Sequence, residues 1–161
     1  MYRRQERAAR LDMPVGSPRA YALFAHCFTG SKDIFAAARV SASLAERSIA
    51  VLRFDFTGLG HSDGEFANTN FTSNVGDIVA AAKWLAENYA PPRILIGHSL
   101  GGAAVLAAAS EVPGVKAVAT IGAPFDPAHV SDNFSNAIEA INRNGKAEVS
   151  LGGRPMVIKR Q

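Results

Sequence analysis

One serine of this sequence stands where a nucleophile would be placed. The stretch RILIGHSLGG, residues 93–102, leads from an apolar run into a glycine-rich turn around Ser99. The pattern Gly-x-Ser-x-Gly between a strand and a helix is typical of a nucleophile elbow, in which a sharp turn holds the serine hydroxyl out at the edge of a sheet. Gly97 and Gly101 remove side chains that would collide with the neighbouring strand and helix. Ser99 is therefore a candidate nucleophile, and the alternative is a turn in which it only caps the helix.

Two backbone N–H groups near this serine are candidates to stabilise an oxyanion. In an acyl-transfer site one donor is the residue after the nucleophile, here Leu100, and the other comes from the loop after an earlier strand. The stretch HCFTGSKD, residues 26–33, follows such a strand, and we expect the N–H of Phe28 to be the second donor. Three side chains are expected to border the substrate there: His26, Cys27 and His98. Cys27 as the nucleophile is the alternative, but it has no histidine in a suitable motif.

A second glycine-rich loop is expected at the same sheet edge. The stretch RFDFTGLGHSDGE, residues 53–65, contains three glycines directly after an apolar run. A phosphate-binding loop is conceivable, but the third glycine of the dinucleotide fingerprint and the Lys-Ser/Thr pair of a P-loop are both missing. We therefore interpret the loop as structural, with hydrogen bonds from Asp55 and Ser62, and expect no cofactor.

The apolar pattern predicts alternating strands and helices. Strands are expected at residues 8–13, 19–27, 49–56, 93–97 and 115–124, and helices at 33–48, 73–89 and 100–110. Asp33 is expected to cap the first of these helices. Because the connections are short, this order indicates an α/β fold: a mostly parallel sheet with helices on both faces, in three layers. The last part of the chain instead predicts a helix at 131–145 and two short strands within 147–161 around a Gly152-Gly153 turn.

Length and composition restrict the kind of protein. The 161 residues suit one domain, and 48% apolar residues suffice for a core. The net charge is +3, and the four arginines within residues 2–10 are too sparse to predict a nucleic-acid partner. The single cysteine, Cys27, excludes an internal disulfide and fits a cytoplasmic location. We expect no metal site, no signal peptide and no membrane partner, since no apolar run reaches the roughly 18 residues of a spanning helix.

Three motifs in this order resemble the α/β-hydrolase superfamily: AHCFTGSKD, LRFDFTGLGHSDG and LIGHSLGG. The sequence is most similar to the hydrolase half of bacterial hydrolase/OsmC-like fusion proteins, from about Ala8 to its end. The resemblance implies a serine hydrolase that acts on small-molecule esters or related acyl substrates without a cofactor. Ser99 then matches the nucleophile, and the N–H groups of Leu100 and Phe28 match the oxyanion hole. Cys27 departs from the glycine that many relatives carry there.

The resemblance is incomplete at the carboxyl end. In this superfamily the serine is followed along the chain by an acid and then by a histidine, both normally after later strands. The sequence ends before those strands, so we expect one truncated domain, residues 1–161, that lacks the final strands. Within it, residues 128–161 are expected to form a cap-like or insert-like region of one helix and one hairpin.

Few residues of this chain can complete a triad. Of the four histidines, His98 is next to the serine and is expected to point away from its hydroxyl, while His26 and His61 precede it and are assigned structural roles. His129 is the only histidine after Ser99, and Asp126 lies three residues before it. These two are the only downstream acid and base at the expected sheet edge. The alternative is a loop with a turn aspartate and an exposed histidine, because so short a separation restricts both side chains.

Two functions are therefore considered. The first is a serine esterase-like hydrolase, and the second is a catalytically incomplete fragment that binds a small ligand or a partner chain. Without later strands, the strand within 115–122 would have a bare edge, which invites association. Either the tail at 147–159 covers this edge or the chain forms a homo-oligomer there.

Overall fold

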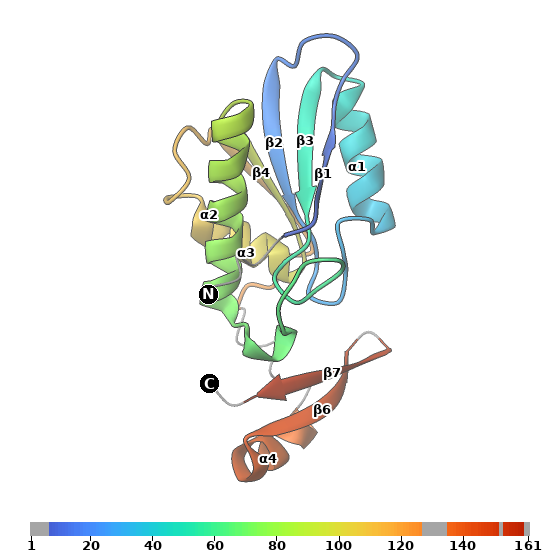
Figure 1. Cartoon of the computed structure of the whole chain (residues 1–161), viewed down its shortest axis with the longest axis vertical. Coiled ribbons are helices and arrows are strands. Elements are labelled where there is room, and N and C mark those ends of the chain that lie inside the picture. The colour runs from blue at the N-terminus through green and yellow to red at the C-terminus, as the bar shows by residue number, and fades with distance from the viewer. Residues whose placement is uncertain (1–6, 127–134, 152, 160–161) are drawn as a thin grey trace.

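A five-stranded sheet forms the centre of the computed structural model, which describes residues 7–126, 135–151 and 153–159. Its strands, in chain order, are β1 (Ala9–Asp12), β2 (Ala20–Ala25), β3 (Ile49–Phe54), β4 (Ile94–His98) and β5 (Ala117–Ile121). In space the order is β1-β3-β2-β4-β5, and only β1 runs antiparallel to its neighbour (Figure 1). The predicted strands are thus confirmed, with ends shifted by a few residues.

Helices cover both faces of this sheet (Figure 1). Helix α1 (Phe35–Ala45) packs on one face, where Ala37 lies in a cluster with Phe24 and Val51. Helices α2 (Phe71–Asn88) and α3 (Leu100–Ala108) pack on the other face. The predicted fold class is therefore confirmed: an α/β fold with a mostly parallel sheet between two helical layers.

The apolar stripe predicted for the second helix faces the core. Ile78 and Leu85 of α2 are fully buried, and Val75 and Ala82 are at most 8% exposed. The helix begins at a capping box, in which the Asn70 side chain accepts the N–H of Ser73 at 2.8 Å and the Ser73 hydroxyl accepts the N–H of Asn70 at 2.9 Å.

The predicted helix cap at Asp33 is wrong. The residue before α1 is Ile34, and no side chain caps this helix end. The Asp33 carboxylate instead lies 3.0 Å from the Lys32 ammonium and 3.6 Å from the Arg53 guanidinium. Two cations within ion-pair distance thus turn the side chain away from the helix N–H groups.

A helix and a hairpin follow the sheet. They are α4 (Ser135–Asn144), β6 (Lys146–Leu151) and β7 (Arg154–Lys159), and the two strands pair antiparallel in a separate sheet. Figure 1 shows this hairpin at the carboxyl ends of the parallel strands. It meets the short 3-10 helix η1 (Phe66–Asn68), where the Lys159 ammonium donates to Asn68 Oδ1 at 2.8 Å. The predicted hairpin and the described part of the predicted helix are confirmed, while residues 127–134 lie outside the described residues.

Strand β5 is the outer strand of the described sheet. Four of its five residues are exposed, including Ile121 at 39%. The hairpin forms its own sheet and leaves β5 exposed, so the alternative that the tail at 147–159 covers this edge is wrong for the described residues. Self-association through β5 stays a prediction. None of the helices in the described residues is both long and apolar enough to cross a membrane.

Candidate active site

Ser99 lies at a sharp turn between β4 and α3. Its backbone has φ 56° and ψ −123°, and in the described part of the chain only Ser48 also has a positive φ without being glycine. A residue with a side chain pays about 1 to 3 kcal/mol for such a conformation. Hydrogen bonds hold it in place: the Ser99 N–H donates to the Ile121 carbonyl at 2.8 Å, and the Ser99 carbonyl accepts from Gly102 at 2.8 Å. This is the backbone geometry that a nucleophile elbow requires.

Three glycines allow this turn to pack closely. A Cβ atom at Gly97 would lie 2.5 Å from Gly102 Cα, and one at Gly101 would lie 2.5 Å from the Ala25 carbonyl oxygen. A Cβ atom at Gly102 would lie 2.7 Å from that of Ala123. Real Cβ atoms do not approach other atoms so closely. The predicted role of Gly97 and Gly101 is confirmed, and Gly102 adds a third close approach that the sequence analysis did not identify.

The loop after β2 places Phe28 against η1. The Gly30 N–H donates to the Cys27 carbonyl at 2.9 Å, which closes the loop into a tight turn. The half-buried Phe28 ring meets the Phe66 ring edge-on, with centroids 4.6 Å apart. Leu100 is the first residue of α3, so its N–H is among the N–H groups that a helix leaves without an intrahelical acceptor. The two predicted oxyanion donors therefore lie in a tight loop and at a helix N-terminus.

His26 does not border an open surface. Its side chain is fully buried, with Nδ1 2.6 Å from the Cys27 carbonyl oxygen, and Nε2 accepts the Phe56 N–H at 3.3 Å. Both contacts fit a neutral ring that carries its proton on Nδ1. Burial lowers the pKa of His26 and favours that neutral form. The expectation that His26 touches the substrate is therefore wrong for this structure, because it is a positioning residue for the loop.

A buried carboxylate joins the loop after β2 to the loop after β3. Asp55 is fully buried, and its carboxylate accepts the Lys32 N–H at 2.5 Å, the Lys32 ammonium at 3.1 Å and the His61 N–H at 2.9 Å. The Ser62 hydroxyl donates to the Asp55 carbonyl at 2.7 Å. Gly60, with φ 56°, leaves room for the carboxylate, because a Cβ there would lie 2.7 Å from Oδ1. The predicted hydrogen-bonding roles of Asp55 and Ser62 are confirmed.

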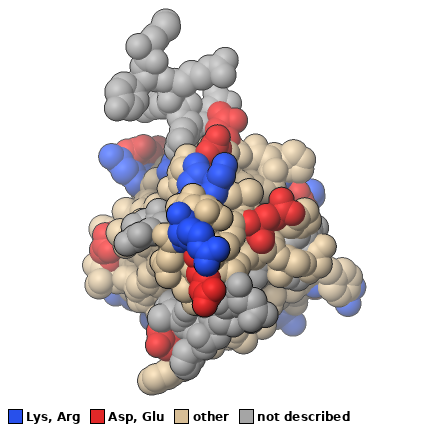
Figure 2. Space-filling view, turned by 90° about the horizontal axis from the view of Figure 1, so that it is seen from below, with Lys and Arg blue, Asp and Glu red and all other residues tan. Residues whose placement is uncertain are grey.

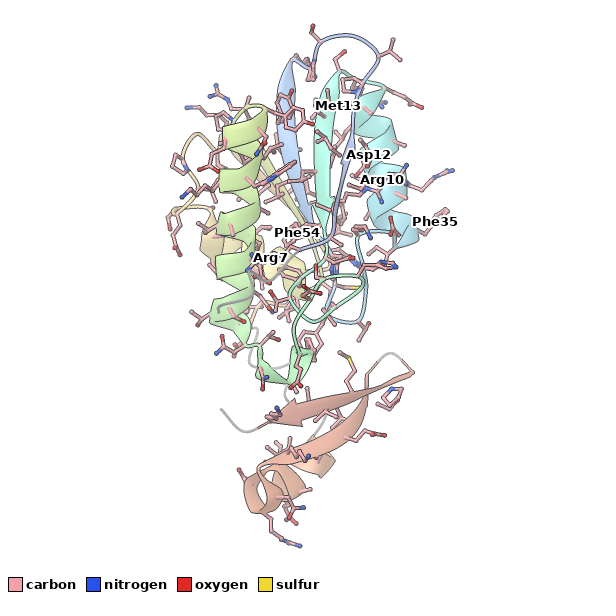
Figure 3. The ribbon with its side chains drawn as sticks, in the orientation of Figure 1. Arg7, Arg10, Asp12, Met13, Phe35 and Phe54 are labelled. Carbon is pink, nitrogen blue, oxygen red and sulfur yellow. The ribbon has the colours of Figure 1, made fainter. Side chains whose placement is uncertain are left out.

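Sequence analysis did not identify Arg53 as part of this network. This buried side chain donates to both Asp12 oxygens, at 2.6 and 3.1 Å, and to the Lys32 carbonyl at 2.5 Å. Asp12, labelled in Figure 3, lies on β1, so Arg53 connects this edge strand of the sheet to the loop after β2. Burial opposes the charge of Lys32, but its hydrogen bonds to Asp33 and Asp55 outweigh burial and raise the pKa of Lys32. A charged residue within the apolar run at 49–56 was the signal that could have identified Arg53.

A second buried carboxylate, that of Asp77, binds the described segment before β1. Asp77 of α2 accepts the Thr57 N–H at 2.8 Å and the Thr57 hydroxyl at 3.0 Å. Arg7 donates to the same carboxylate at 2.8 Å, and Figure 3 shows Arg7 against α2. The segment before β1 thereby fixes the first residues of the loop after β3, which carries His61 and Ser62.

The other candidate side chains differ in their surroundings. His98 is half-buried, and in the described part of the chain its buried Nδ1 atom has no hydrogen-bond partner. The His61 side chain is 77% exposed and faces the Lys32 ammonium at 3.3 Å. Asp126 is half-buried after β5, and His129 lies outside the described residues. Among the described residues, no group of three or more His, Cys, Asp or Glu side chains could hold a metal ion.

Comparisons with known proteins match this architecture. The family model described as "Alpha/beta hydrolase family" matches residues 22–156. A mitochondrial palmitoyl-protein thioesterase, ABHD10 of Mus musculus, is 33% identical over 104 residues, 65% of this chain and 32% of its own length. The esterase domain of a Rhodothermus marinus protein is 48% identical with a TM-score of 0.67, over 98% of this chain and 65% of that chain.

A more distant structure shares the fold alone. A putative hydrolase from Agrobacterium vitis is 18% identical with a TM-score of 0.77, over 97% of this chain and 63% of that chain. The present chain thus spans about a third of the mouse thioesterase and just under two thirds of the two structures.

The close packing of the turn gives a first prediction. Gly101→Ala is expected to lower the free energy of unfolding by about 2 to 3 kcal/mol, because the new methyl group meets backbone carbonyl groups that cannot move aside. Gly76→Ala is the matched control, since its Cβ in α2 has open space and raises the free energy of unfolding by about 0.5 to 1 kcal/mol. Urea unfolding followed by circular dichroism measures both, and equal effects would contradict the close packing.

The buried histidine gives a prediction on pH. The unfolded chain protonates His26 near its ordinary pKa of 6.5, whereas the pKa in the folded chain is lower. The stability that depends on neutral His26 is therefore complete above that pH and is lost as the pH falls below it, by up to about 1.4 kcal/mol per pH unit. Urea unfolding between about pH 5 and pH 8 measures the slope of the free energy of unfolding against pH, and His26→Gln is expected to remove the part of this slope that comes from His26. His61→Gln, at an exposed histidine, should keep it, and identical slopes in both variants would refute the assignment.

Proposed function

This chain belongs to the alpha/beta hydrolase family, and we propose that it hydrolyses esters or thioesters with Ser99 as the nucleophile. The backbone conformation of Ser99 carries the proposal. A serine held at positive φ between a strand and a helix, with glycines on both sides, is a costly arrangement that serves to expose a hydroxyl. The esterase and thioesterase names of the relatives support an acyl substrate.

The proposed reaction follows the usual course of acyl transfer. Ser99 Oγ attacks the carbonyl carbon of the substrate while a base takes the hydroxyl proton. The negative charge that develops on the carbonyl oxygen is stabilised by the N–H groups of Leu100 and Phe28. Collapse of this intermediate expels an alcohol or a thiol, which receives the proton, and leaves an ester on Ser99. Water then attacks that ester, returns the serine hydroxyl and releases the carboxylic acid.

We propose Asp126 and His129 as the acid and the base within this chain. Asp126 follows β5, whose Ile121 carbonyl accepts the Ser99 N–H, so the loop that carries it begins beside the nucleophile. Two of the three described histidines are occupied elsewhere, His26 with Cys27 and Phe56 and His61 with Lys32, and the third, His98, is next to the serine. The last observation also favours a second candidate function, a catalytically incomplete module that binds a small acyl ligand or a partner chain. A cytoplasmic location, the absence of a cofactor and the resemblance to the hydrolase half of OsmC-like fusion proteins stay predictions from the sequence.

The role of Ser99 can be tested by covalent labelling. A fluorophosphonate probe is expected to add one phosphonyl group, the mass of the probe less HF, to the wild-type chain and none to Ser99→Ala, because only an activated serine displaces fluoride from the phosphorus. Ser110→Ala is the control, since this exposed serine follows α3. Intact-mass spectrometry and circular dichroism of the three proteins report labelling and folding. A well-folded wild type that stays unlabelled would reject the hydrolase proposal and favour the binding module.

The acid and the base need a separate test. His129→Gln and Asp126→Asn are expected to slow labelling of Ser99 by about 100-fold or more, because the proton of the hydroxyl then has no oriented acceptor. His61→Gln is the matched control and should label at the wild-type rate. If the rate constant for labelling is the same in all four proteins, Asp126 and His129 are not the catalytic partners of Ser99.

A further inference from the structure

A groove lies between the hairpin and the loop that follows β3. Its volume is about 630 Å³, which is within the range of small-ligand sites. One wall comes from this loop and η1, and the other comes from β6 and β7; the lining residues named below are Glu65, Phe66, Lys146, Val157 and Lys159. The hairpin lies at the carboxyl ends of the parallel strands (Figure 1), and Ser99 directly follows the carboxyl end of β4. The groove is therefore at the same end of the sheet as Ser99.

An aromatic pair connects this groove to the proposed oxyanion loop. Phe66 lines the groove, and its ring packs edge-on against the Phe28 ring with centroids 4.6 Å apart. Phe28 supplies one of the proposed oxyanion donors. When the substrate carbonyl accepts from the Phe28 N–H, the rest of the substrate would extend along the Phe28 and Phe66 rings toward the groove. This step rests on the proposed function of Ser99.

The hairpin brings two like charges together at the groove. Lys146 and Lys159 are direct cross-strand partners, and like charges in that position destabilise a hairpin unless they are neutralised. The Lys159 ammonium is 3.4 Å from a Glu65 carboxylate oxygen and donates to Asn68 at 2.8 Å. In the described part of the chain, the Lys146 ammonium has no ion pair or side-chain hydrogen bond, although Glu148 follows it two positions along β6.

The groove thus carries more positive than negative charge. Its lining holds the ammonium groups of Lys146 and Lys159 against the single carboxylate of Glu65. Figure 2 views the molecule from this end and shows Lys and Arg side chains gathered at its centre, with acidic side chains around them. Phe66 and Val157 add apolar surface to the same lining, so the groove suits a ligand with both an apolar part and an anionic group.

We infer that this groove binds an anionic group of the acyl substrate, a carboxylate or a phosphate, between Lys146 and Lys159. The apolar part of the substrate packs on Phe66 and Val157. A bound anion pairs with the Lys146 ammonium, which otherwise has no counter-charge. It also pairs with the Lys159 ammonium, which remains in contact with the Glu65 carboxylate. The preferred substrates are accordingly anionic esters or thioesters.

Two matched substrate pairs test this inference. The mono-p-nitrophenyl ester of glutarate is compared with p-nitrophenyl pentanoate, so that the acyl part differs in one carboxylate. Butyryl-4′-phosphopantetheine is compared with butyryl-pantetheine, so that the leaving thiol differs in one phosphate. At low salt, kcat/KM of the wild type is expected to be about tenfold higher for the anionic member of at least one pair, and salt should reduce this ratio. The pair that responds identifies the source of the anion.

Variants on the two walls are expected to change this ratio in opposite directions. Lys146→Gln should lower the preference for the anionic substrate to about twofold or less, and Lys146→Arg should restore it. Glu65→Gln should raise the preference, because it releases Lys159 and removes the competing carboxylate. Lys83→Gln is the control, since this exposed lysine lies on α2 and pairs with Glu87. A ratio that Lys146→Gln and Lys83→Gln change equally would overturn the inference.

A binding measurement separates this inference from the proposed reaction. Titration calorimetry of Ser99→Ala with monoethyl glutarate and with 4′-phosphopantetheine detects the groove without catalysis. If the wild type neither labels nor turns over, binding that weakens with salt and with Lys146→Gln still supports the groove. If the wild type labels at Ser99 but shows no anionic preference and no such binding, the groove inference fails while the hydrolase proposal stands.

Discussion

The buried carboxylate of Asp55 is the constraint on which the rest of the candidate site depends. A charge without solvent must be paired and fully hydrogen-bonded, and Asp55 obtains its partners from two loops that leave neighbouring parallel strands. The loop after β2 contributes Lys32, and the loop after β3 contributes the N–H of His61. Since neither loop can move without removing a partner from the carboxylate, the Phe28 and Phe66 segments take fixed places at the edge of the sheet.

The turn at Ser99 adds a second constraint of a different kind. Here the fold holds an unfavourable backbone conformation by packing rather than by charge. Gly97, Gly101 and Gly102 bring the turn, the end of β2 and the residues after β5 closer than any side chain would allow. The hydrogen bond from Ser99 to the Ile121 carbonyl ties the turn to β5. The conformation of Ser99 therefore depends on strands on both sides of β4, which is why it belongs to the whole sheet and not to the five-residue motif.

Charge connects these constraints to the surface where a substrate would arrive. Lys32 neutralises the buried carboxylate of Asp55, and Arg53 pairs with the half-buried carboxylate of Asp12, so these charges are balanced within the fold. The hairpin instead brings two lysines to the open side, with a single glutamate opposite them in the groove. The interior thus uses its charges to hold loops, whereas the groove leaves charge available for a ligand. This division is consistent with the acyl-transfer site and the anion-binding groove that we propose.

The sequence by itself determined the layers and the position of the serine. Continuous apolar runs at 19–27, 49–56 and 93–97 predict buried parallel strands because both of their faces need cover, and the glycines around Ser99 predict a close turn from local geometry alone. Only the tertiary structure decided that Asp33 pairs with Lys32 instead of capping α1, that His26 is sealed inside, and that Lys146 meets Lys159. Each of these outcomes depends on which distant groups come within a few ångströms, and a charged or titratable side chain takes its role from those neighbours. Local pattern specifies which face of an element is buried, but the partners of a polar group are specified only when the chain has closed around it.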